Sequence, residues 1–360
     1  MKLILVGGFL GAGKTRLMKE AAHCLLKKGF RVGLITNDQA ASLVDTSFLL
    51  HEGFVVKEVH GSCFCCDFGG FMNAIEELRR ELNPEVIIAE PVGSCTDLSA
   101  TLLQPIKELY RETIEISPLS VLIDPKRLKD LLDKQETGLH QDAVYIIQKQ
   151  LEEADLIVVS KSDLLPFSEC ESLIDQTARK FLNRGVIALS AHSGEGIQGW
   201  VESMMASNEG GRYLAEIDYD IYARGEAVLG WLNATIDLTG EGVNWNRFST
   251  LFLKEFDKAL KLKEARVGHA KLILERGDSY LRGNLTGTSQ EHEWEGGVEE
   301  GGAVKLTLNL RVQMLPEELQ ACAKDVLYSV SDKIQFNNQS WNCFSPGRPN
   351  PSHRYSQIKN

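Results

Sequence analysis

The segment GFLGAGKT, residues 8–15, constrains the fold of this chain more than any other segment. It fits the pattern G-x-x-x-x-G-K-[ST], in which the N–H groups of a loop and of the following helix hold phosphates. An apolar stretch, KLILVG, comes before it and a helical pattern, TRLMKEAAHCLLKKG, comes after it. Strand, loop and helix in this order predict a nucleotide-phosphate site with contacts from Gly8, Gly11, Ala12, Gly13, Lys14 and Thr15.

The first half of the chain alternates short apolar strands with amphipathic helices. The predicted strands cover 2–7, 31–37, 54–60, 86–91, 118–125, 156–163 and 185–191. Most are continuous apolar runs, which are typical of parallel strands buried on both faces. The pattern predicts an α/β fold, a doubly wound and mostly parallel P-loop NTPase sheet whose ligands bind at the carboxyl ends of the strands.

The periodicity changes along the chain and predicts four segments. They are a nucleotide-binding domain (1–206), a linker (207–224), a smaller α+β domain (225–331) and a proline-containing tail without periodicity (332–360). In the α+β domain we expect the order β-α-β-β-α, with one long strand over 267–285. The Gly- and Glu-rich stretch 287–302 should be a solvated, mobile loop between the two long strands.

Charge and hydropathy exclude several classes of protein. The net charge of −11 argues against a nucleic-acid backbone as the main partner, because phosphate binding needs a basic face. No uncharged run approaches the roughly 18 residues that a membrane span requires. The apolar amino terminus is short and continues into the glycine motif, unlike a signal peptide. We therefore expect a cytoplasmic protein without a membrane partner.

A second predicted strand end supplies an acidic residue for the nucleotide site. The apolar run of VIIAEPVG ends in Glu90, where P-loop proteins place a residue that serves Mg²⁺ directly or through water. We expect Thr15 and Glu90 to serve Mg²⁺ and Lys14 to contact the β- and γ-phosphates. The alternative is that Glu90 only ends a strand.

Two further strand ends predict recognition of guanine. In LIVVSKSD, Lys161 and Asp163 resemble the N-K-x-D motif, with Ser160 in place of Asn. The Asp163 carboxylate can accept hydrogen bonds from guanine N1–H and the 2-amino group, a donor pair that adenine lacks. In ALSAH, Ser190 and Ala191 are placed to contact the base through a backbone turn. These residues therefore favour GTP over ATP. The alternative is that they form a surface loop that does not contact a base.

The stretch EVHGSCFCCDFGG places three thiols, Cys63, Cys65 and Cys66, at another predicted strand end. A helix predicted over 67–82 follows, and its dipole should stabilise thiolates. Clustered thiolates select ions such as Zn²⁺, and three sulfurs would leave a coordination position open for exchange. A redox pair formed by Cys63 and Cys66 and plain structural packing are the alternatives.

Other histidines and cysteines give weaker signals. His60 is interpreted as a strand-end residue without a metal role, although it could be an additional ligand. Cys95 is interpreted as packing at a helix start, with ligation as the alternative. Cys24 is assigned to the core. A metal relay through the tail is the less favoured interpretation of Cys343 and His353.

Together these motifs resemble the CobW-type GTPases, relatives of the urease and hydrogenase maturation GTPases UreG and HypB. The resemblance rests on GFLGAGKT, the C-x-C-C cluster, the segment from Glu90 to Gly93 and the N-K-x-D-like motif, and it covers residues 1 to about 205. It implies a GTP-dependent metallochaperone that loads Zn²⁺, Co²⁺ or a similar ion into a client protein. It also implies loops that reorder with the γ-phosphate.

The chain departs from the family pattern after the second predicted strand. Relatives usually carry N-E-F-G-E, whereas this chain has NDQAA, with Asp38 at the first acidic position and Ala41 at the second. Asp45 is a candidate replacement. The His-rich stretch of the family is absent, since the eight histidines are scattered. The resemblance therefore leaves the metal and its coordination open.

We expect slow hydrolysis of GTP to GDP that acts as a switch. Lys14 would balance phosphate charge, Glu90 would serve Mg²⁺, and Asp38 or Asp45 would lie near the attacking water. The carboxy-terminal domain would recognise a client metalloprotein or cofactor-dependent enzyme, and relatives often pair across their nucleotide sites. The alternatives are a P-loop small-molecule kinase, which usually prefers ATP, and a thiol redox sensor with bound nucleotide.

Overall fold

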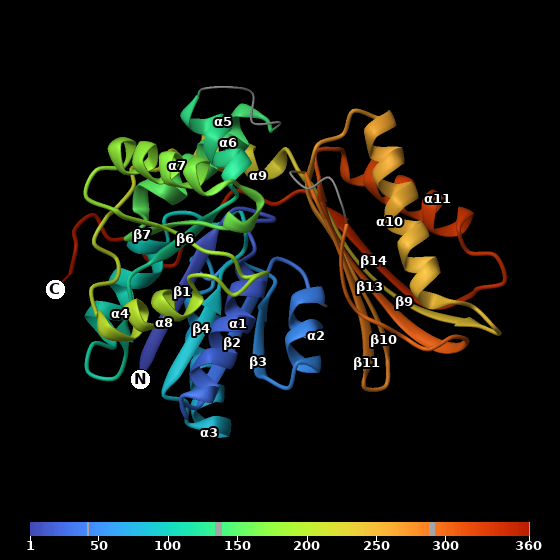
Figure 1. Ribbon diagram of the computed structural model, residues 1–360, viewed down its shortest axis with the longest axis horizontal. Helices are drawn as coiled ribbons and strands as arrows, with labels where there is room; N and C mark the ends of the chain where they lie inside the picture. Colours follow the sequence, from blue (N-terminus) through green and yellow to red (C-terminus); the bar gives the residue numbers. More distant parts are fainter. Residues whose placement is uncertain (42, 134–138, 288–291, 360) are drawn as a thin grey trace. The chain divides into compact units, whose positions relative to one another are not determined.

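The computed structural model describes residues 1–41, 43–133, 139–287 and 292–359 (Figure 1). The chain divides into two compact units: unit 1 comprises 1–39, 54–225 and 348–360, and unit 2 comprises 40–53 and 226–347. Within the described ranges, none of the helices combines the length and the apolar character that crossing a membrane requires.

A parallel sheet forms the centre of unit 1. Its strands are β1 (Lys2–Gly8), β2 (Val32–Asp38), β3 (Val55–His60), β4 (Val86–Glu90), β5 (Glu115–Ile116), β6 (Ser120–Ile123), β7 (Leu156–Val159) and β8 (Gly185–Ala188). The order is β3-β2-β4-β1-β6-β7-β8, and the short β5 also pairs with β1. The chain thus builds the sheet on one side of β1 and then on the other. This confirms the predicted doubly wound sheet and places the carboxyl end of β1 at the reversal of strand order, where such folds bind ligands.

Helices connect these strands, as the apolar periodicity predicts. In α3, Phe71, Ile75 and Leu78 form one buried face, and the Asp67 carboxylate accepts a hydrogen bond from the Gly70 N–H at the amino-terminal end. The helices of unit 1 are α1 (Lys14–Lys27), α3 (Phe68–Leu82), η1 (Ser99–Leu103), α4 (Gln104–Leu109), α5 (Pro125–Leu132), α6 (Gln141–Glu153), η2 (Ser162–Leu164), α7 (Phe167–Lys180), α8 (Ile197–Ala206) and α9 (Tyr219–Ala227).

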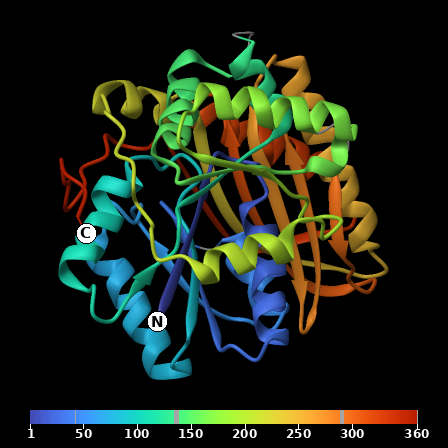
Figure 2. The same cartoon turned by 60° about the vertical axis from the view of Figure 1, so that its left-hand side comes forward.

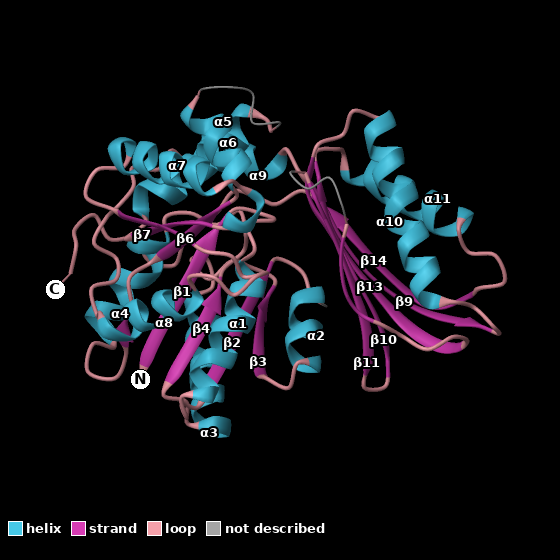
Figure 3. Ribbon diagram, in the orientation of Figure 1, coloured by secondary structure: helices cyan, strands magenta, loops and turns pink. Residues whose placement is uncertain are grey.

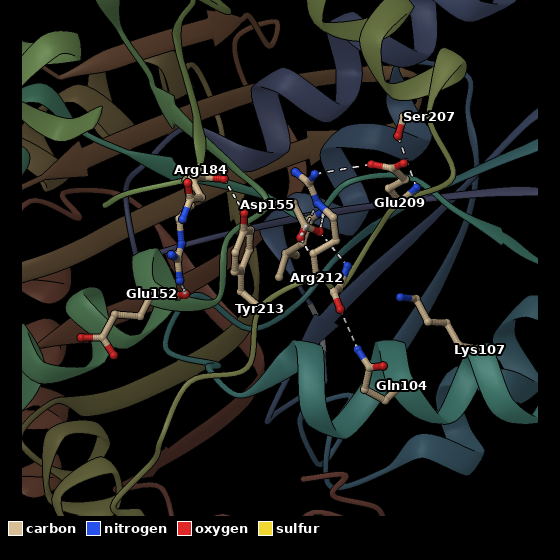
Figure 4. Close-up of polar contacts among 12 residues, drawn as sticks. Gln104, Lys107, Glu152, Asp155, Arg184, Ser207, Glu209, Arg212 and Tyr213 are labelled. Atoms are coloured by element: carbon tan, nitrogen blue, oxygen red, sulfur yellow. Dashed lines mark hydrogen bonds and ion pairs between the residues drawn. The ribbon is translucent and has the colours of Figure 1, made fainter. Parts of the chain in front are cut away.

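The segment predicted as a linker, 207–224, is anchored on unit 1 (Figure 4). The buried Asp155 carboxylate accepts hydrogen bonds from the N–H groups of Gly211, at 2.6 Å, and Arg212, at 2.8 Å. The Arg184 guanidinium lies 3.9 Å from the centre of the Tyr213 ring. From residue 219 onward the segment is helical, as α9. The predicted linker is therefore held by specific contacts.

Unit 2 is an antiparallel sheet with helices. Its order is β12-β11-β10-β13-β9-β14, and Figure 3 shows the strands in magenta. Leucines at alternate positions of β13 pack with phenylalanines of α10 in one buried core. The elements are α2 (Val44–His51), β9 (Gly230–Gly240), α10 (Trp245–Leu262), β10 (Val267–Arg276), β11 (Ser279–Thr286), β12 (Glu293–Gly296), β13 (Gly302–Val312), α11 (Pro316–Ser329) and β14 (Gln335–Phe344).

Unit 2 corrects three expectations about secondary structure. The predicted long strand over 267–285 is a hairpin, because Gly277 has a φ of +56° and turns the chain between β10 and β11. The Gly- and Glu-rich stretch contains the strand β12, although 288–291 lie outside the described residues. The tail predicted to lack periodicity begins with a strand, β14, which pairs with β9.

The last residues of the chain pack on unit 1 (Figures 1 and 2). The red carboxy-terminal trace runs beside α4 in both views. The Tyr355 N–H donates to the Ala100 carbonyl at 3.0 Å, and the Lys359 N–H donates to Gln104 Oε1 at 2.7 Å. Arg354 forms an ion pair with the buried Asp97, with 2.7 Å between Nε and Oδ2. The tail is therefore an ordered part of unit 1.

Candidate nucleotide and metal site

The glycine motif joins β1 to α1 with the conformation that a phosphate loop requires. Gly11 and Gly13 have positive φ angles, +77° and +90°, which residues other than glycine rarely adopt. A Cβ on Gly8 would lie 2.3 Å from the Leu122 carbonyl oxygen of the neighbouring β6. The helix α1 begins at Lys14 without an acidic residue in its first turn. Its amino-terminal N–H groups can accordingly receive an anion.

Three predicted residues meet at the start of α1. The Thr15 hydroxyl donates to Glu90 Oε2 at 2.8 Å, and Lys14 Nζ lies 3.6 Å from Glu90 Oε1. All three side chains are buried. A hydroxyl and a carboxylate are oxygen donors of the kind that Mg²⁺ takes, so this set fits the ion. The geometry shows that β1 and β4 bring the predicted phosphate and Mg²⁺ residues together.

The sequence analysis missed Arg127, an arginine that donates a hydrogen bond to the phosphate loop. Arg127, from α5, donates from Nη1 to the Leu10 carbonyl at 3.0 Å, and its guanidinium lies 5.1 Å from the centre of the Phe9 ring. Burial lowers the pKa of Arg127 to about 10. No local motif marks this residue, because its partner lies 117 positions away in the chain. Arg127 fixes the backbone of the phosphate loop.

The predicted base-recognition residues lie at the ends of β7 and β8. Lys161 has a φ of +52°, and its Nζ lies 3.4 Å from Asp124 Oδ2 at the end of β6. Asp163 is exposed to solvent. The Ser160 hydroxyl donates to the Ile123 carbonyl at 3.1 Å. It is therefore occupied within the fold.

The turn after β8 has a fixed shape. Ser190 is fully buried, and its Oγ accepts hydrogen bonds from the N–H groups of His192, at 3.1 Å, and Ser193, at 3.0 Å. The Ser162 N–H donates to the Leu189 carbonyl at 3.2 Å, which ties this turn to the Lys161–Asp163 segment. Ser190 and Ala191 thus lie beside the segment predicted to read the base.

The three clustered cysteines lie close together between β3 and α3. The sulfurs of Cys63, Cys65 and Cys66 all lie within 4.8 Å of one another. The distances are 2.9 Å between Cys63 and Cys65 and 3.8 Å between Cys65 and Cys66. The first two thiols are buried and Cys66 is half-buried. Close sulfurs of this kind form a donor set for a borderline or soft metal ion.

The pKa values of Cys65 and Cys66 are raised, although a helix start follows them. Hydrogen bonding with Cys63 raises the pKa of the Cys66 thiol to about 11, and it also raises the pKa of Cys65. Asp67 at the start of α3 holds the Gly70 N–H with its own carboxylate, which places a negative group where dipole stabilisation was expected. Binding of an ion to Cys65 and Cys66 would therefore have to displace their protons.

Asn37, a residue that the sequence did not single out, connects β2 to the cysteine loop. Its Nδ2 donates to the carbonyls of Val59, at 2.9 Å, and Ser62, at 2.8 Å, and its Oδ1 accepts from the Phe64 N–H at 3.0 Å. The next residue is Asp38, which ends β2 and is buried. One short stretch therefore carries both a predicted hydrolytic residue and the clamp on the cysteine loop.

Of the other residues considered in the sequence, Asp45 and Cys343 belong to unit 2, whereas His60 and Cys24 belong to unit 1. Within unit 2, Asp45 is paired with Lys271, at 2.5 Å, and Arg282, at 3.3 Å. Cys343 lies in β14 and donates to the Pro316 carbonyl at 3.0 Å. His60 is exposed at the end of β3, and Cys24 is half-buried on α1.

The carboxy-terminal tail lies against the cysteine loop. The Asn350 N–H donates to Cys66 Sγ at 3.2 Å. The Ser352 N–H donates to the Cys65 carbonyl at 3.0 Å, and its hydroxyl donates to the Cys66 carbonyl at 2.9 Å. The His353 ring packs edge-on against Phe68, with 4.9 Å between ring centres. The tail thus fixes the backbone of two clustered cysteines.

Comparisons with known proteins identify the family to which the chain belongs. The family model of the CobW/HypB/UreG nucleotide-binding domain matches residues 2–187. The chain is 28% identical to the zinc chaperone YeiR of Escherichia coli over 164 residues, which cover 44% of this chain and 46% of YeiR. It is 27% identical to the zinc chaperone CobW of a Sinorhizobium species over 221 residues, which cover 53% of this chain and 59% of that protein.

The chain therefore spans about half the length of these two curated relatives. Among solved structures, HypB from Helicobacter pylori in complex with nickel is similar with 15% identity and a TM-score of 0.43. The similarity covers 60% of this chain and 90% of that one.

Proposed function

Since the chain belongs to the CobW/HypB/UreG family, we propose that it is a GTP-dependent metallochaperone that binds a transition metal and delivers it to a client protein. One observation carries the proposal. Three sulfurs within 4.8 Å of one another follow β3, at the edge of the sheet where the phosphate loop follows β1. Zn²⁺ is the favoured cargo, because relatives are named zinc chaperones and because thiolates suit this ion. Co²⁺ is the next candidate.

The nucleotide site supports slow hydrolysis of GTP to GDP. In the proposal, Lys14 and the N–H groups at the start of α1 hold the phosphates, and Asp163 accepts hydrogen bonds from guanine. Thr15 and Glu90 would hold Mg²⁺, which supplies neutralisation of phosphate charge when bound. Asp38 is the proposed orienting residue for the attacking water. Asp45 is left out because it is paired with two basic side chains in unit 2.

Two segments can carry a signal between nucleotide and metal. Glu90 accepts a hydrogen bond from the Thr15 hydroxyl, and it is the last residue of β4 before the loop that follows. Asp38 is joined through Asn37 to the cysteine loop by three hydrogen bonds. Binding of GTP and Mg²⁺ would change the partners of Thr15, Glu90 and Asp38. We propose that this change alters the affinity of the cysteines for metal.

The competing functions have less support. A small-molecule kinase of this fold would usually prefer ATP, and the exposed Asp163 favours guanine. A redox sensor would use Cys63 and Cys66 as a disulfide and would leave the third thiol, Cys65, without a role. The client, which we propose to be a metalloprotein or cofactor-dependent enzyme, and nucleotide-dependent pairing of two chains belong to the same proposal.

The deciding experiment is a Zn²⁺ titration against a competing chelator. The full chain is measured alone, with GDP, and with a non-hydrolysable GTP analogue and Mg²⁺. We expect the Zn²⁺ affinity to differ between the nucleotide states by roughly 5- to 150-fold, the range of typical coupling between two sites. Parallel titrations with ATP and GTP analogues test the base preference.

Two variants complete that experiment. Replacing Cys63, Cys65 and Cys66 by Ser should abolish tight Zn²⁺ binding. A control that replaces Cys170 and Cys322, which lie outside the cluster, should retain it. The proposal fails if the Zn²⁺ affinity is the same in all nucleotide states and unaffected by the triple replacement.

A further inference from the structure

Cys95 lies beside the cysteine cluster although it comes from a different part of the chain. It belongs to the loop between β4 and η1, and 1% of its surface is exposed. Its sulfur lies 3.6 Å from the sulfur of Cys65, 30 residues away in sequence. The cysteine expected to pack at a helix start therefore contacts the proposed metal site directly.

Two sulfur separations around Cys65 match a tetrahedral site. The Cys95 sulfur lies outside the group of three that are all within 4.8 Å of one another, so it would move closer to Cys63 and Cys66 on metal binding. With Zn–S bonds of about 2.3 Å, tetrahedral geometry places the sulfurs about 3.8 Å apart. The observed separations from Cys65 are 3.8 Å to Cys66 and 3.6 Å to Cys95. The Cys63–Cys65 pair, at 2.9 Å, would open by roughly 0.9 Å to reach that geometry. Cys65 thus has neighbours at ligand spacing from both loops.

The loop that carries Cys95 is firmly held. Gln150, from α6, donates from Nε2 to the carbonyls of Gly93, at 3.1 Å, and Cys95, at 2.8 Å. Glu153, one turn further along α6, accepts from the Thr96 hydroxyl at 3.0 Å and from the Ser99 N–H at 2.9 Å. These bonds to buried groups hold the backbone on both sides of Cys95 before any ion binds, which contributes to the preorganisation that a ligand needs.

We propose that Cys95 supplies a fourth thiolate and closes a four-sulfur Zn²⁺ site with Cys63, Cys65 and Cys66. This inference rests on the proposed function and names a ligand that the C-x-C-C motif does not contain. Each thiol gives up its proton to solvent as its sulfur bonds to the ion. Cys95 lies five residues after Glu90. The segment 90–95 would therefore contact Thr15 through Glu90 and the metal through Cys95.

The test is X-ray absorption spectroscopy of the full chain loaded with one equivalent of Zn²⁺. The wild type should show about four sulfur neighbours near 2.3 Å, and Cys95→Ser should show three with one lighter neighbour. Loss of this ligand should also weaken Zn²⁺ binding by roughly tenfold or more, as measured by chelator competition. Cys170→Ser, which changes a buried thiol of α7, should keep four sulfurs.

Three outcomes separate the inference from the proposed function. Loss of one sulfur in Cys95→Ser supports the inference, provided that the metal-free variant unfolds at nearly the wild-type temperature; Cys95→Ala is the second variant for this comparison. Three sulfurs in both wild type and Cys95→Ser overturn the inference and leave the proposed function intact. Absence of Zn²⁺ binding by the wild type overturns both.

Discussion

Replacement of Asn37 by Ala tests whether one side chain organises the cysteine loop. Asn37 is buried at the end of β2 and makes three hydrogen bonds, to Val59, Ser62 and Phe64. All three partners are backbone groups, and they lie on either side of the turn that leads into Cys63. The substitution therefore removes the clamp without touching a thiol or the phosphate loop.

The expected magnitude follows from these bonds. A hydrogen bond in a protein contributes about 1 kcal/mol net, so three contribute about 3 kcal/mol. The buried Phe64 N–H loses its Asn37 acceptor, and an unsatisfied donor costs about 1–3 kcal/mol. We expect the free energy of unfolding to fall by about 2–4 kcal/mol. If that whole loss falls on the organisation of the loop, Zn²⁺ binding weakens by roughly 30- to 700-fold, since every 1.4 kcal/mol is about tenfold.

Three measurements on one variant check this reasoning. Urea unfolding gives the change in stability, and chelator competition gives the Zn²⁺ affinity with and without a GTP analogue. The ratio of these two affinities should approach one in Asn37→Ala, because the link between Asp38 and the cysteine loop is gone. Asn73→Ala, an exposed position on α3, is the matched control and should change stability by less than about 0.5 kcal/mol.

If Asn37→Ala binds Zn²⁺ within about threefold of the wild type, with an unchanged response to nucleotide, the clamp does not organise the site. A loss of stability alone, with Zn²⁺ binding and nucleotide response retained, would show that Asn37 supports the fold and does not transmit the signal.

Three further predictions concern single residues. Burial raises the pKa of Glu153 to about 8 from its ordinary 4.5, so its contribution to stability is complete below about pH 4.5 and is lost as the pH rises through about 8. Glu153→Gln should accordingly flatten the fall in melting temperature over that range, and a slope equal to that of the wild type would contradict the assignment. Arg127→Ala removes the donor to the Leu10 carbonyl and should weaken GDP binding by roughly tenfold in a fluorescence titration; unchanged affinity would show that the loop keeps its shape without the arginine. Asp163→Asn should weaken GTP binding by about 10- to 100-fold and improve binding of xanthosine triphosphate, whose 2-oxo group can accept from the Asn amide; equal GTP affinity would remove Asp163 from base recognition.

Local patterns predicted the sheet of unit 1 well. The continuous apolar runs became parallel strands, because strands buried on both faces admit few polar residues. The pattern of apolar residues is insufficient in unit 2. It predicts a single strand over 267–285, whereas the positive φ at Gly277 turns this stretch into the β10–β11 hairpin.

The candidate site was predictable only where its residues belong to short motifs. Lys14, Thr15 and Glu90 stand at strand ends that a parallel sheet must bring to one edge, and the structure places them in contact. Arg127 and Gln150 carry no motif. Each acts on a backbone carbonyl of a distant loop, so its role depends on how α5 and α6 pack.

The phosphate loop, the strands of the parallel sheet and the cluster of three thiols are each marked by residues that are neighbours in the chain, so the sequence predicts them. The contact of Cys95 with the cluster, the hold of Asn37 on the cysteine loop and the position of the tail against that loop are seen only in the folded chain. These contacts join strand ends and loops that the sequence separates by tens to hundreds of residues. Their formation requires the sheet to be assembled first, so no local pattern of residue types could reveal them.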